Sequence, residues 1–389
     1  MKTAVRVVTA ALLALVLLGC GQNVVVWQKL IDLGGDETAT AIASDGSNYY
    51  VSFIATKPGG SDHAGWYVTK LDKNGQEVWT QNYKGSAWAE CQDLWCDSLG
   101  HLYAVGRTRV DGKQLCLVCR YAPDGNIAWQ KALSVGDRTW GMGICPVPGD
   151  KIAVCGAAGS DTNTDYMVAE LERSDGRTDW VRNYDQSHND VAARIDCDPK
   201  GNLALVGLRS DNAAGADVTL MMLKPDGDTL WSRRYDSGGD DEPGDIVFDP
   251  FGNILATATA AVGDSVRCVI LEYDAAGGAI RKAAYGAQAQ ATGKGIFVTR
   301  DADVFVCGKL YAGRPVAGKQ EPGKLLVFQY KPTALSVWER QYAAGSDAEG
   351  VDLVVNGDAY VVANVKNKTN DVLVCRIARP AAASWPPGR

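Results

Sequence analysis

Short apolar runs separated by glycine-bearing turns repeat along this chain. Residues 192–197, 202–207, 218–223 and 230–235 are such runs, rich in β-branched, aromatic and aliphatic residues. Even spacing and tight turns predict four short strands that follow one another as an antiparallel meander. The same four runs can be read through the rest of the chain, and the first run of each unit lies near residue 38, 91, 140, 192, 244, 293 or 348.

A tryptophan recurs at one place in this pattern, in the fourth run of each unit. The intervals along the series are 50 to 57 residues, and the series consists of Trp27, Trp79, Trp129, Trp180, Trp231, Arg281 in the next slot, and Trp338. Four strands in a repeat of this length are the signature of a propeller blade. The sequence therefore predicts an all-β fold, a seven-bladed β-propeller with four antiparallel strands per blade, over residues 24–378.

The unit count leaves one strand over at each end of the predicted propeller. The seventh unit has only three runs, while Val25–Ile31 resembles the fourth run of another unit, residues 77–83. We expect the N-terminal strand to complete the last blade and close the ring, because closure leaves no unpaired sheet edge between the chain ends.

The extreme N-terminus has the layout of a secretory signal peptide over residues 1–19. Lys2 and Arg6 precede an apolar run at 7–18 that is too short for a stable membrane span. The sequence Leu-Leu-Gly-Cys at 17–20 resembles the bacterial lipobox, which implies cleavage before Cys20 and lipidation of its sulfur. Gly21 in place of aspartate then favours the outer membrane. The alternative is an ordinary signal peptide with a cysteine nearby.

The remaining segments and the net charge limit the classes of partner that the sequence allows. Residues 20–23 form the lipidated cysteine and a short tether, and the Pro- and Ala-rich residues 379–389 are predicted to be disordered. The formal net charge is -7, and removing Lys2 and Arg6 with the signal peptide makes it -9. This acidic balance argues against nucleic acid and against adsorption on anionic lipid. The membrane contact predicted here is the lipid on Cys20.

The repeated turns resemble a known bacterial propeller repeat. Aspartate, glycine and asparagine recur at fixed offsets in the segments 189–202 with 223–227, 239–241 with 249–253, and 45–48 with 71–75. These segments are similar to the repeat known as SBBP, and the similarity covers nearly the whole mature chain. The resemblance implies a propeller fold and a surface or secreted setting. Its motifs are structural and imply no shared chemistry.

Two repeated features have a structural and a functional interpretation. The tryptophans could form a ring of aromatic ligands, but a tyrosine often follows four residues later on the same strand face, which favours packing between blades. Ten cysteines follow Cys20, and several occupy slots that hold Val or Phe in other units, which favours buried free thiols. Cys116 and Cys119, three apart on a strand, should point to opposite faces. Cys91 is the exception to this expectation, because it begins a first strand near the predicted central channel.

The sequence predicts no catalytic residue and no defined metal site. Its only histidines are His63, His101 and His188, without metal-ligand spacing. Acidic loop residues could take a hard cation such as calcium, although Asp and Glu are also common in loops without one. These residues are Asp36 and Glu37, and Asp240, Asp241 and Glu242 with Asp245. No other cofactor is identified.

The candidate binding face is the one on which the long loops open. Loops after the second and fourth strands share this face, and the first group is expected at 57–65, 108–114, 158–165, 209–217 and 311–323. The side chains expected nearest the channel mouth are Trp88, Glu90, Arg138, Trp140, Asp190, Asp241 and Glu242. Aromatic groups with charges of both signs suit a saccharide or a polypeptide. The alternative is ordinary loop surface.

These features together predict a lipid-anchored, non-enzymatic binding or scaffold protein of the bacterial cell envelope, with a protein or polysaccharide partner. The alternative is a glycan-active enzyme on a propeller, a hydrolase or a lyase. A hydrolase would need two carboxylates beside the channel, about 5 or 6.5–9.5 Å apart. A quinone-dependent dehydrogenase ranks third, and no pocket for its cofactor can be traced in the sequence.

Overall fold

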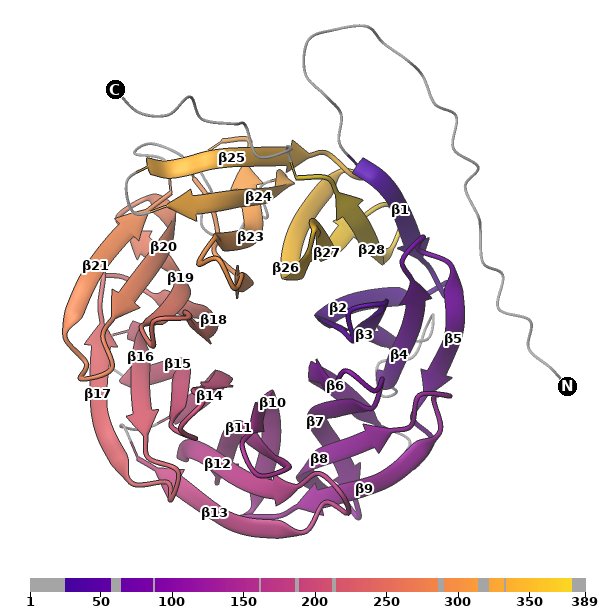
Figure 1. The fold of residues 1–389 in the computed structure, drawn as a ribbon, viewed down its shortest axis with the longest axis vertical. Coiled ribbons are helices and arrows are strands. Elements are labelled where there is room, and N and C mark those ends of the chain that lie inside the picture. The colour runs from indigo at the N-terminus through magenta and orange to yellow at the C-terminus, as the bar shows by residue number, and fades with distance from the viewer. Residues whose placement is uncertain are drawn as a thin grey trace, which may run out of the picture.

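A computed structural model describes residues 25–56, 64–86, 88–160, 162–185, 189–211, 215–285, 290–313, 322–331 and 334–379. Within these ranges the chain forms strands β1 to β28 and no helix. The sheets stand around a central axis as the blades of a propeller (Figure 1). The all-β propeller predicted from the repeats is confirmed. The predicted signal peptide, Cys20 with its tether, and residues 380–389 lie outside the described ranges.

In each four-stranded sheet formed by consecutive strands of the chain, the first strand lies nearest the axis (Figure 1). The first two contain β2 (Asp36–Ser44), β3 (Asn48–Thr56), β4 (Ala64–Asp72) and β5 (Glu77–Asn82), then β6 (Ala89–Cys96), β7 (Leu102–Val110), β8 (Lys113–Tyr121) and β9 (Ile127–Leu133). Two later sheets contain β18 (Asp241–Phe248), β19 (Ile254–Val262), β20 (Ser265–Tyr273) and β21 (Ala279–Ala284), then β22 (Ile296–Val298), β23 (Val304–Tyr311), β24 (Gly323–Lys331) and β25 (Ala334–Tyr342).

One sheet in the ring has eight strands. It combines two meanders, β10 (Arg138–Val147), β11 (Lys151–Gly159), β12 (Thr164–Glu172) and β13 (Thr178–Tyr184) with β14 (Asn189–Cys197), β15 (Leu203–Asp211), β16 (Gly215–Leu223) and β17 (Thr229–Tyr235). A single parallel residue pair, Thr164 with Asn189, joins them. The described residues therefore form five separate four-stranded sheets and one of eight, where the repeats predict seven of four. The difference arises at this one bridge.

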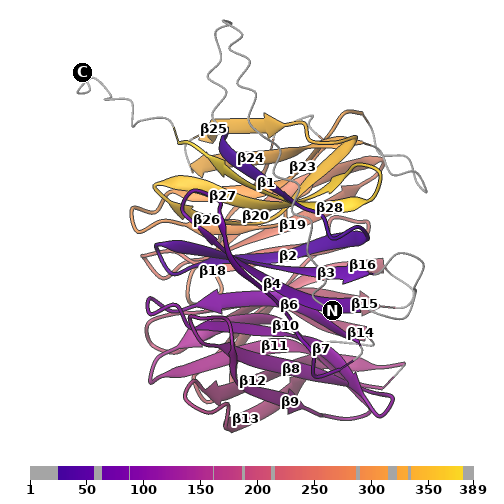
Figure 2. The same cartoon turned by 90° about the vertical axis from the view of Figure 1, so that its right-hand side faces the viewer.

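The N-terminal strand closes the ring as predicted. β1 (Val25–Ile31) pairs antiparallel with β28 (Asn370–Ile377), on the outer side of β27 (Asp358–Lys366) and β26 (Asp347–Asn356). Figure 2 shows β1 lying beside β28 at the rim. The side chain of Ile31 joins buried residues of the last sheet and of the first, including Tyr360 and Tyr49. Burial between neighbouring sheets thus holds the two chain ends together.

The inner strands share a β-bulge that the sequence pattern did not predict. The register shifts by one residue at Ala39/Ala41, Cys91/Asp93, Gly141/Gly143, Ala192/Arg194, Pro243/Ile246 and Gly350/Asp352. A bulge turns the following side chain toward a new direction. β22 is shorter than the strand expected from residue 293. Before it, the amide of Lys294 donates to the carbonyl oxygen of Cys307, and the amide of Cys307 donates to that of Gly295, so the pairing there is irregular.

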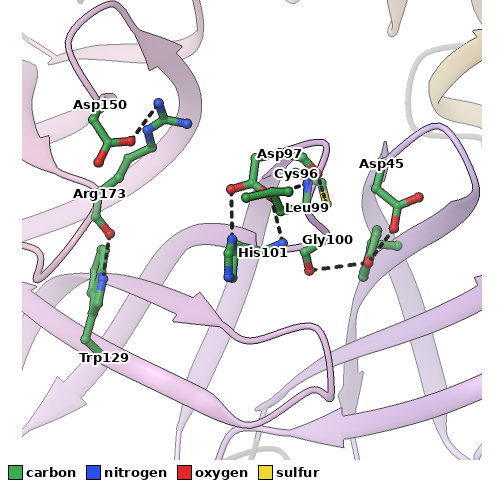
Figure 3. A network of polar contacts seen from close by, with 10 residues as sticks. Asp45, Cys96, Asp97, Leu99, Gly100, His101, Trp129, Asp150 and Arg173 are labelled. Atoms are coloured by element: carbon green, nitrogen blue, oxygen red, sulfur yellow. Dashed lines mark hydrogen bonds and ion pairs between the residues drawn. The ribbon is translucent and has the colours of Figure 1, made fainter.

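The recurrent tryptophans pack one sheet against the next, as predicted. The indole of Trp129 lies over Gly176, where an added Cβ would be 2.8 Å from the ring. Its Nε1 donates to the carbonyl oxygen of Arg173 at 3.0 Å (Figure 3). Trp27 and Trp231 donate to the same kind of turn in the sheet that follows each of them, at 3.0 and 3.1 Å. The turn glycines therefore leave room for an indole from the neighbouring sheet.

We expect Trp129→Phe to lower the free energy of unfolding by about 1 kcal/mol more than Trp180→Phe does. Both changes remove part of an indole from a sheet interface, but only Trp129 also loses a hydrogen bond. The Nε1 of Trp180 is buried without a partner among the described residues. Urea unfolding of the two variants measures the difference, and equal losses would show that the indole hydrogen bond contributes nothing.

The described cysteines behave as packed thiols. All ten are free, and all but Cys197 are buried. Cys116 and Cys119 belong to different hydrophobic clusters, on the two faces of β8 as predicted. Cys91 is 0% exposed, and burial raises the pKa of its thiol well above the usual value. It is therefore a core residue and has no open path to the channel.

Two details of the loops and the tail differ from expectation. The loop expected at 108–114 is a two-residue hairpin turn, in which Asp111 and Gly112 have φ angles of 50° and 78°. Arg379, the first residue of the predicted tail, is held to the fold. Its guanidinium lies 3.0 Å from Asp303, and its backbone amide donates to Asp358. Residues 57–63, 212–214 and 314–321 of the other long loops lie outside the described ranges.

Candidate functional site

Three aspartates, one buried and two half-buried, lie at the bulges of inner strands and link neighbouring sheets. Asp93, Asp245 and Asp352 lie on β6, β18 and β26. One carboxylate oxygen of each accepts the backbone amide of the next residue in the chain. The other oxygen accepts an amide from the neighbouring inner strand, namely Ile144 at 3.0 Å, Ile296 at 3.3 Å and Ile42 at 2.9 Å. The ring of carboxylates therefore connects sheets around the axis.

Arg194 takes the equivalent position on β14 and is the cation among these carboxylates. Its Nη1 donates to the carbonyl oxygen of Met142 on β10 at 3.2 Å, and its Nη2 to that of Thr40 on β2 at 3.4 Å. β2 and β14 lie on opposite sides of the ring (Figure 1), so the side chain reaches across the axis. Charge interactions connect the guanidinium with Asp93, Asp245 and Asp352.

Burial dominates the electrostatics of this ring. Loss of hydration raises the pKa of Asp93, Asp245 and Asp352, and the positive charge of Arg194 opposes the rise at each of them. Asp196 on β14 makes the same kind of link by accepting the amide of Phe248 at 2.8 Å. Burial raises the pKa of Asp196 to about 6. These carboxyls are therefore less ionised near neutral pH than ordinary surface carboxyls.

A cavity of about 400 Å³ opens at the axis beside Arg194. Its lining is largely apolar or glycine, with charged groups from several inner strands, and consists of Met142, Val191, Ala193, Arg194, Leu208, Glu242, Pro243, Gly244, Asp245, Lys294, Gly295, Val351 and Asp352. Glu242, at the mouth, has a side chain 65% exposed and pairs with Lys294 at 3.0 Å. Of the predicted binding residues, only Glu242 lines this cavity.

Two predicted tryptophans stand among arginines at the same end of neighbouring inner strands. The guanidinium of Arg109 lies 4.7 Å from the ring centre of Trp88, and that of Arg107 lies 5.3 Å away. Glu90 accepts from the Nε of Arg107 at 2.6 Å. Just before β6, Trp88 thus makes cation–π contacts with two arginines, and one of these arginines also pairs with a carboxylate.

Trp140 repeats this arrangement one sheet further. The guanidinium of Arg138 lies 5.5 Å from its ring centre. We call the five residues Trp88, Arg107, Arg109, Arg138 and Trp140 the Trp–Arg patch. All five are partly or fully exposed. Arg107 and Arg109 were not predicted from the sequence. Their spacing of two residues near the end of β7 places both side chains on one face of the strand, and this spacing could have identified them.

Asp190 and Asp241, expected at the channel mouth, are buried, each 0% exposed. Asp241 accepts the backbone amide of Ser237 at 2.8 Å and its hydroxyl at 2.5 Å. The backbone oxygen of Asp190 accepts the hydroxyl of Thr164 at 3.2 Å. Both residues lie at the start of an inner strand. Because they are buried there, their side chains are not available to a ligand on the long-loop face.

The sequence contains a signal for the central ring that the repeat analysis did not use. In all seven units the residue after the ring position is Ile or Leu on an inner strand, as in Asp93–Leu94, Arg194–Ile195 and Asp352–Leu353. A charged residue directly before this Ile or Leu is therefore placed beside a buried side chain on an inner strand. Aligning the units on this Ile or Leu places Asp93, Arg194, Asp245 and Asp352 in one layer.

The one histidine within the described ranges has a structural contact. Nδ1 of His101 lies 3.0 Å from the carboxylate of Asp97, at the tight turn between β6 and β7 (Figure 3). In two other turns an asparagine in the same place donates to the aspartate, Asn202 to Asp198 and Asn253 to Asp249. His101 therefore takes the place of a turn asparagine on the face opposite the long loops. His63 and His188 lie outside the described ranges.

Several solved structures share this fold. A polysaccharide lyase, PL25 ulvan lyase, aligns with a TM-score of 0.57 at 9% identity, over 90% of this chain and 96% of its own. A hydrazine synthase from Kuenenia stuttgartiensis aligns with a TM-score of 0.55 at 12% identity, over 87% and 96%. A puromycin hydrolase gives 0.55 at 14%, and this chain spans 51% of it. At these identities the likeness shows the propeller fold alone.

No protein-family model and no curated protein matches the sequence. The resemblance to the SBBP repeat therefore stays an interpretation of the turn motifs. Among the described residues no helix is long and apolar enough to cross a membrane.

Proposed function

We propose that this chain is a non-enzymatic binding protein of the bacterial cell envelope that holds a partner protein on its Trp–Arg patch. In this proposal residues 1–19 are removed, and lipid on Cys20 anchors the chain, with the outer membrane as its location. The observation that carries the proposal is a pair of Trp–Arg contacts at the starts of two neighbouring inner strands, Trp88 with Arg107 and Arg109, and Trp140 with Arg138. Trp and Arg are the residue types most enriched at binding hot spots.

The charge of the patch suggests what kind of segment it holds. The guanidiniums of Arg107 and Arg109 lie over the indole of Trp88, and Glu90 accepts a hydrogen bond from Arg107. Guanidinium groups at a binding surface attract acidic segments of a partner. The indole faces supply rigid contact area at small entropic cost. We therefore infer that the partner presents acidic residues beside an apolar side chain.

We also infer that the ring has seven blades. Seven hydrophobic clusters are found among the described residues, and each draws its side chains from two consecutive meanders. One of these clusters lies between β10–β13 and β14–β17, the two halves of the eight-stranded sheet. In this interpretation Thr164 and Asn189 form a contact between two blades at their edges.

Trp88→Ala and Arg109→Ala are each expected to reduce recovery of the partner at least about tenfold, because truncating a hot-spot residue costs more than about 1–2 kcal/mol. The measurement is a crosslinked pull-down of the lipidated protein from its native membrane. Phe251→Ala is the matched control, since Phe251 is 79% exposed in a tight turn on the opposite face. Unchanged recovery with both patch variants would contradict the proposal.

A glycan-active enzyme is the second candidate, and the central cavity is what favours it. Glu242, Asp245 and Asp352 line one cavity, and loss of hydration raises the pKa of Asp245, which suits a general acid. PL25 ulvan lyase, which shares the fold, has been solved bound to -[GlcA(1-4)Rha3S]-. Against this function, Asp245 and Asp352 already accept two backbone amides each. Enrichment of glycan without protein in the pull-down, with cleavage lost in Glu242→Gln, would favour it.

A further inference from the structure

Three carboxylates meet where the ring closes. Asp32 directly follows β1, Glu37 lies on β2, and Asp371 lies near the start of β28. One carboxylate oxygen from each lies within 4.8 Å of the others. The N-terminal strand, the first sheet and the last sheet each supply one of these acids. The cluster therefore lies where the last sheet, whose outer strand is the N-terminal strand, meets the first sheet.

Glu37 has an unused oxygen in this cluster. The residue is 1% exposed, its Oε1 accepts the amide of Gly35 at 3.3 Å, and its Oε2 is buried with no partner among the described residues. Burial raises its pKa to about 7, and the charges of Asp32 and Asp371 add to the rise. In the part of the chain that the structure describes, no Lys or Arg pairs with any of the three. An orphaned, buried carboxylate oxygen is costly unless a ligand satisfies it.

The other two acids are oriented by local donors. Asp371 is 2% exposed and accepts from the Nδ2 of Asn367 at 2.6 Å and from the hydroxyl of Thr369 at 3.1 Å. Asp32 accepts the amide of Gly34 at 2.7 Å through one oxygen. These bonds hold two carboxylates in place without neutralising them. The cluster is thus arranged before any ligand arrives.

A second cluster in the same molecule has the same layout. In both, one acid directly follows a fourth strand, one lies five residues later on the next inner strand, and one lies near the start of the third strand. The second cluster consists of Asp217, Asp236 and Asp241, on and between β16, β17 and β18. The repeat therefore offers an internal comparison between two equivalent positions.

The second cluster contains its own cation. The Nε of Arg234 donates to Asp217 at 2.7 Å, its Nη2 lies 3.2 Å from Asp236, and Ser237 donates to Asp241. At the ring closure the corresponding residues are Leu30, two before Asp32, and Leu33, one after it. Neither leucine side chain can donate a hydrogen bond or carry charge. The closure cluster therefore lacks the groups that neutralise its counterpart.

We propose that Asp32, Glu37 and Asp371 bind one calcium ion, which takes the place that the guanidinium of Arg234 has in the second cluster and fastens the closing strand to the first sheet. Calcium prefers six to eight oxygen ligands, including carboxylates from separate elements, whereas magnesium keeps more of its water and uses fewer carboxylates. Zinc would favour nitrogen or sulfur ligands, and the three residues supply only oxygen. This proposal concerns the fold and does not rest on the proposed function.

The test uses the purified full-length protein after treatment with EDTA. Calorimetric titration with calcium chloride is expected to give one ion per chain, with binding complete at or below about 1 mM. Saturating calcium should raise the melting temperature by about 3–5 °C, because a ligand that binds only the folded state stabilises it. Titration with magnesium is the comparison for ion type.

Two substitutions at the closure separate calcium binding from general damage. Glu37→Gln is expected to abolish the calcium response and to raise the melting temperature in EDTA, because it removes an uncompensated buried charge. Leu30→Arg places a guanidinium where Arg234 lies in the second cluster, and it should give the calcium-free protein the stability that calcium gives the original. Asp236→Asn is the matched control in the second cluster, and its calcium response should be unchanged.

Three results would overturn the proposal. One is no heat and no change in melting temperature when folded protein meets about 1 mM calcium. Another is a calcium response that persists in both Glu37→Gln and Leu30→Arg, which would place the ion elsewhere. An equal response to magnesium would contradict the assignment to calcium. If Glu37→Gln does not fold, Leu30→Arg alone decides between the first cluster and another site.

Discussion

Replacing Arg194 with methionine is expected to lower the free energy of unfolding by about 3–5 kcal/mol at neutral pH. The change keeps an unbranched side chain at the axis but removes the one cation that interacts with Asp93, Asp245 and Asp352. Backbone amides hold each carboxylate in place beside the axis. The cost is that of leaving poorly hydrated carboxylates without their counter-ion. Urea unfolding monitored by tryptophan fluorescence measures it.

The same variant should have a distinct pH dependence. A carboxyl whose pKa is raised by folding contributes most stability below its unfolded pKa, near 4, and this contribution is lost as pH rises through the folded value. Burial raises the pKa of Asp245 and of Asp352, and Arg194 limits the rise. Without Arg194 the loss on raising pH becomes larger and extends to higher pH. The destabilisation should therefore be smaller at pH 5 than at pH 8.

Lys294→Met is the matched control for Arg194→Met. Lys294 lines the same cavity, but it pairs with the exposed carboxylate of Glu242. An exposed pair of this kind contributes about 0–1 kcal/mol. If Arg194→Met costs no more than Lys294→Met, or shows the pH profile of the original protein, the central ring does not depend on its arginine.

Deleting residues 25–31 is expected to abolish cooperative folding of the chain or to lower its stability by on the order of 5 kcal/mol or more, a large part of the stability of a typical domain. The deletion removes β1, uncovers the edge of β28 and takes Ile31 from a buried cluster. It also removes the bond from Trp27 to the carbonyl of Lys73 in the first sheet. An open ring with a bare strand edge should aggregate.

A synthetic peptide with the sequence of residues 23–33 provides the control for this deletion. Added in excess to the shortened chain, it should pair with β28 and restore the near-ultraviolet circular dichroism of the intact protein. A peptide with Ile31 replaced by aspartate should not, because Ile31 is buried at the junction. A shortened chain that unfolds like the original, without peptide, would show that ring closure contributes little.

The repeated pattern was sufficient to predict the blades because side chains of the same kind pack at equivalent positions in each blade. Trp129 and its counterparts recur because an outer strand packs on a turn of the next sheet, as the indole of Trp129 packs on Gly176. The closing role of Val25–Ile31 followed from counting strands, and the pairing with β28 confirms it. Cysteines exchanging with Val and Phe similarly indicated a buried slot. These features depend on local volume and hydrophobicity, which sequence alone records.

The central ring depends on geometry that spacing alone does not determine. A bulge of one residue reverses which side chains face the axis, so Arg194 points across the channel although simple alternation assigns no such role. Asp190 and Asp241 begin their strands at a sheet junction, and the turn before Asp241 supplies hydrogen bonds that draw its side chain inward. The contact between Trp88 and Arg109 joins a residue just before β6 to one on β7. Such contacts require the register.

The measurement that tests the account most directly is site-specific photo-crosslinking of the lipidated protein in its native membrane. A photoreactive residue replaces Val110, which is 45% exposed beside Arg109, or Phe251 on the opposite face. We expect a discrete protein adduct from position 110 that is lost when Trp88 is also changed to alanine, and none from position 251. Adducts of equal yield from both positions, or none from position 110, would contradict partner binding by the Trp–Arg patch.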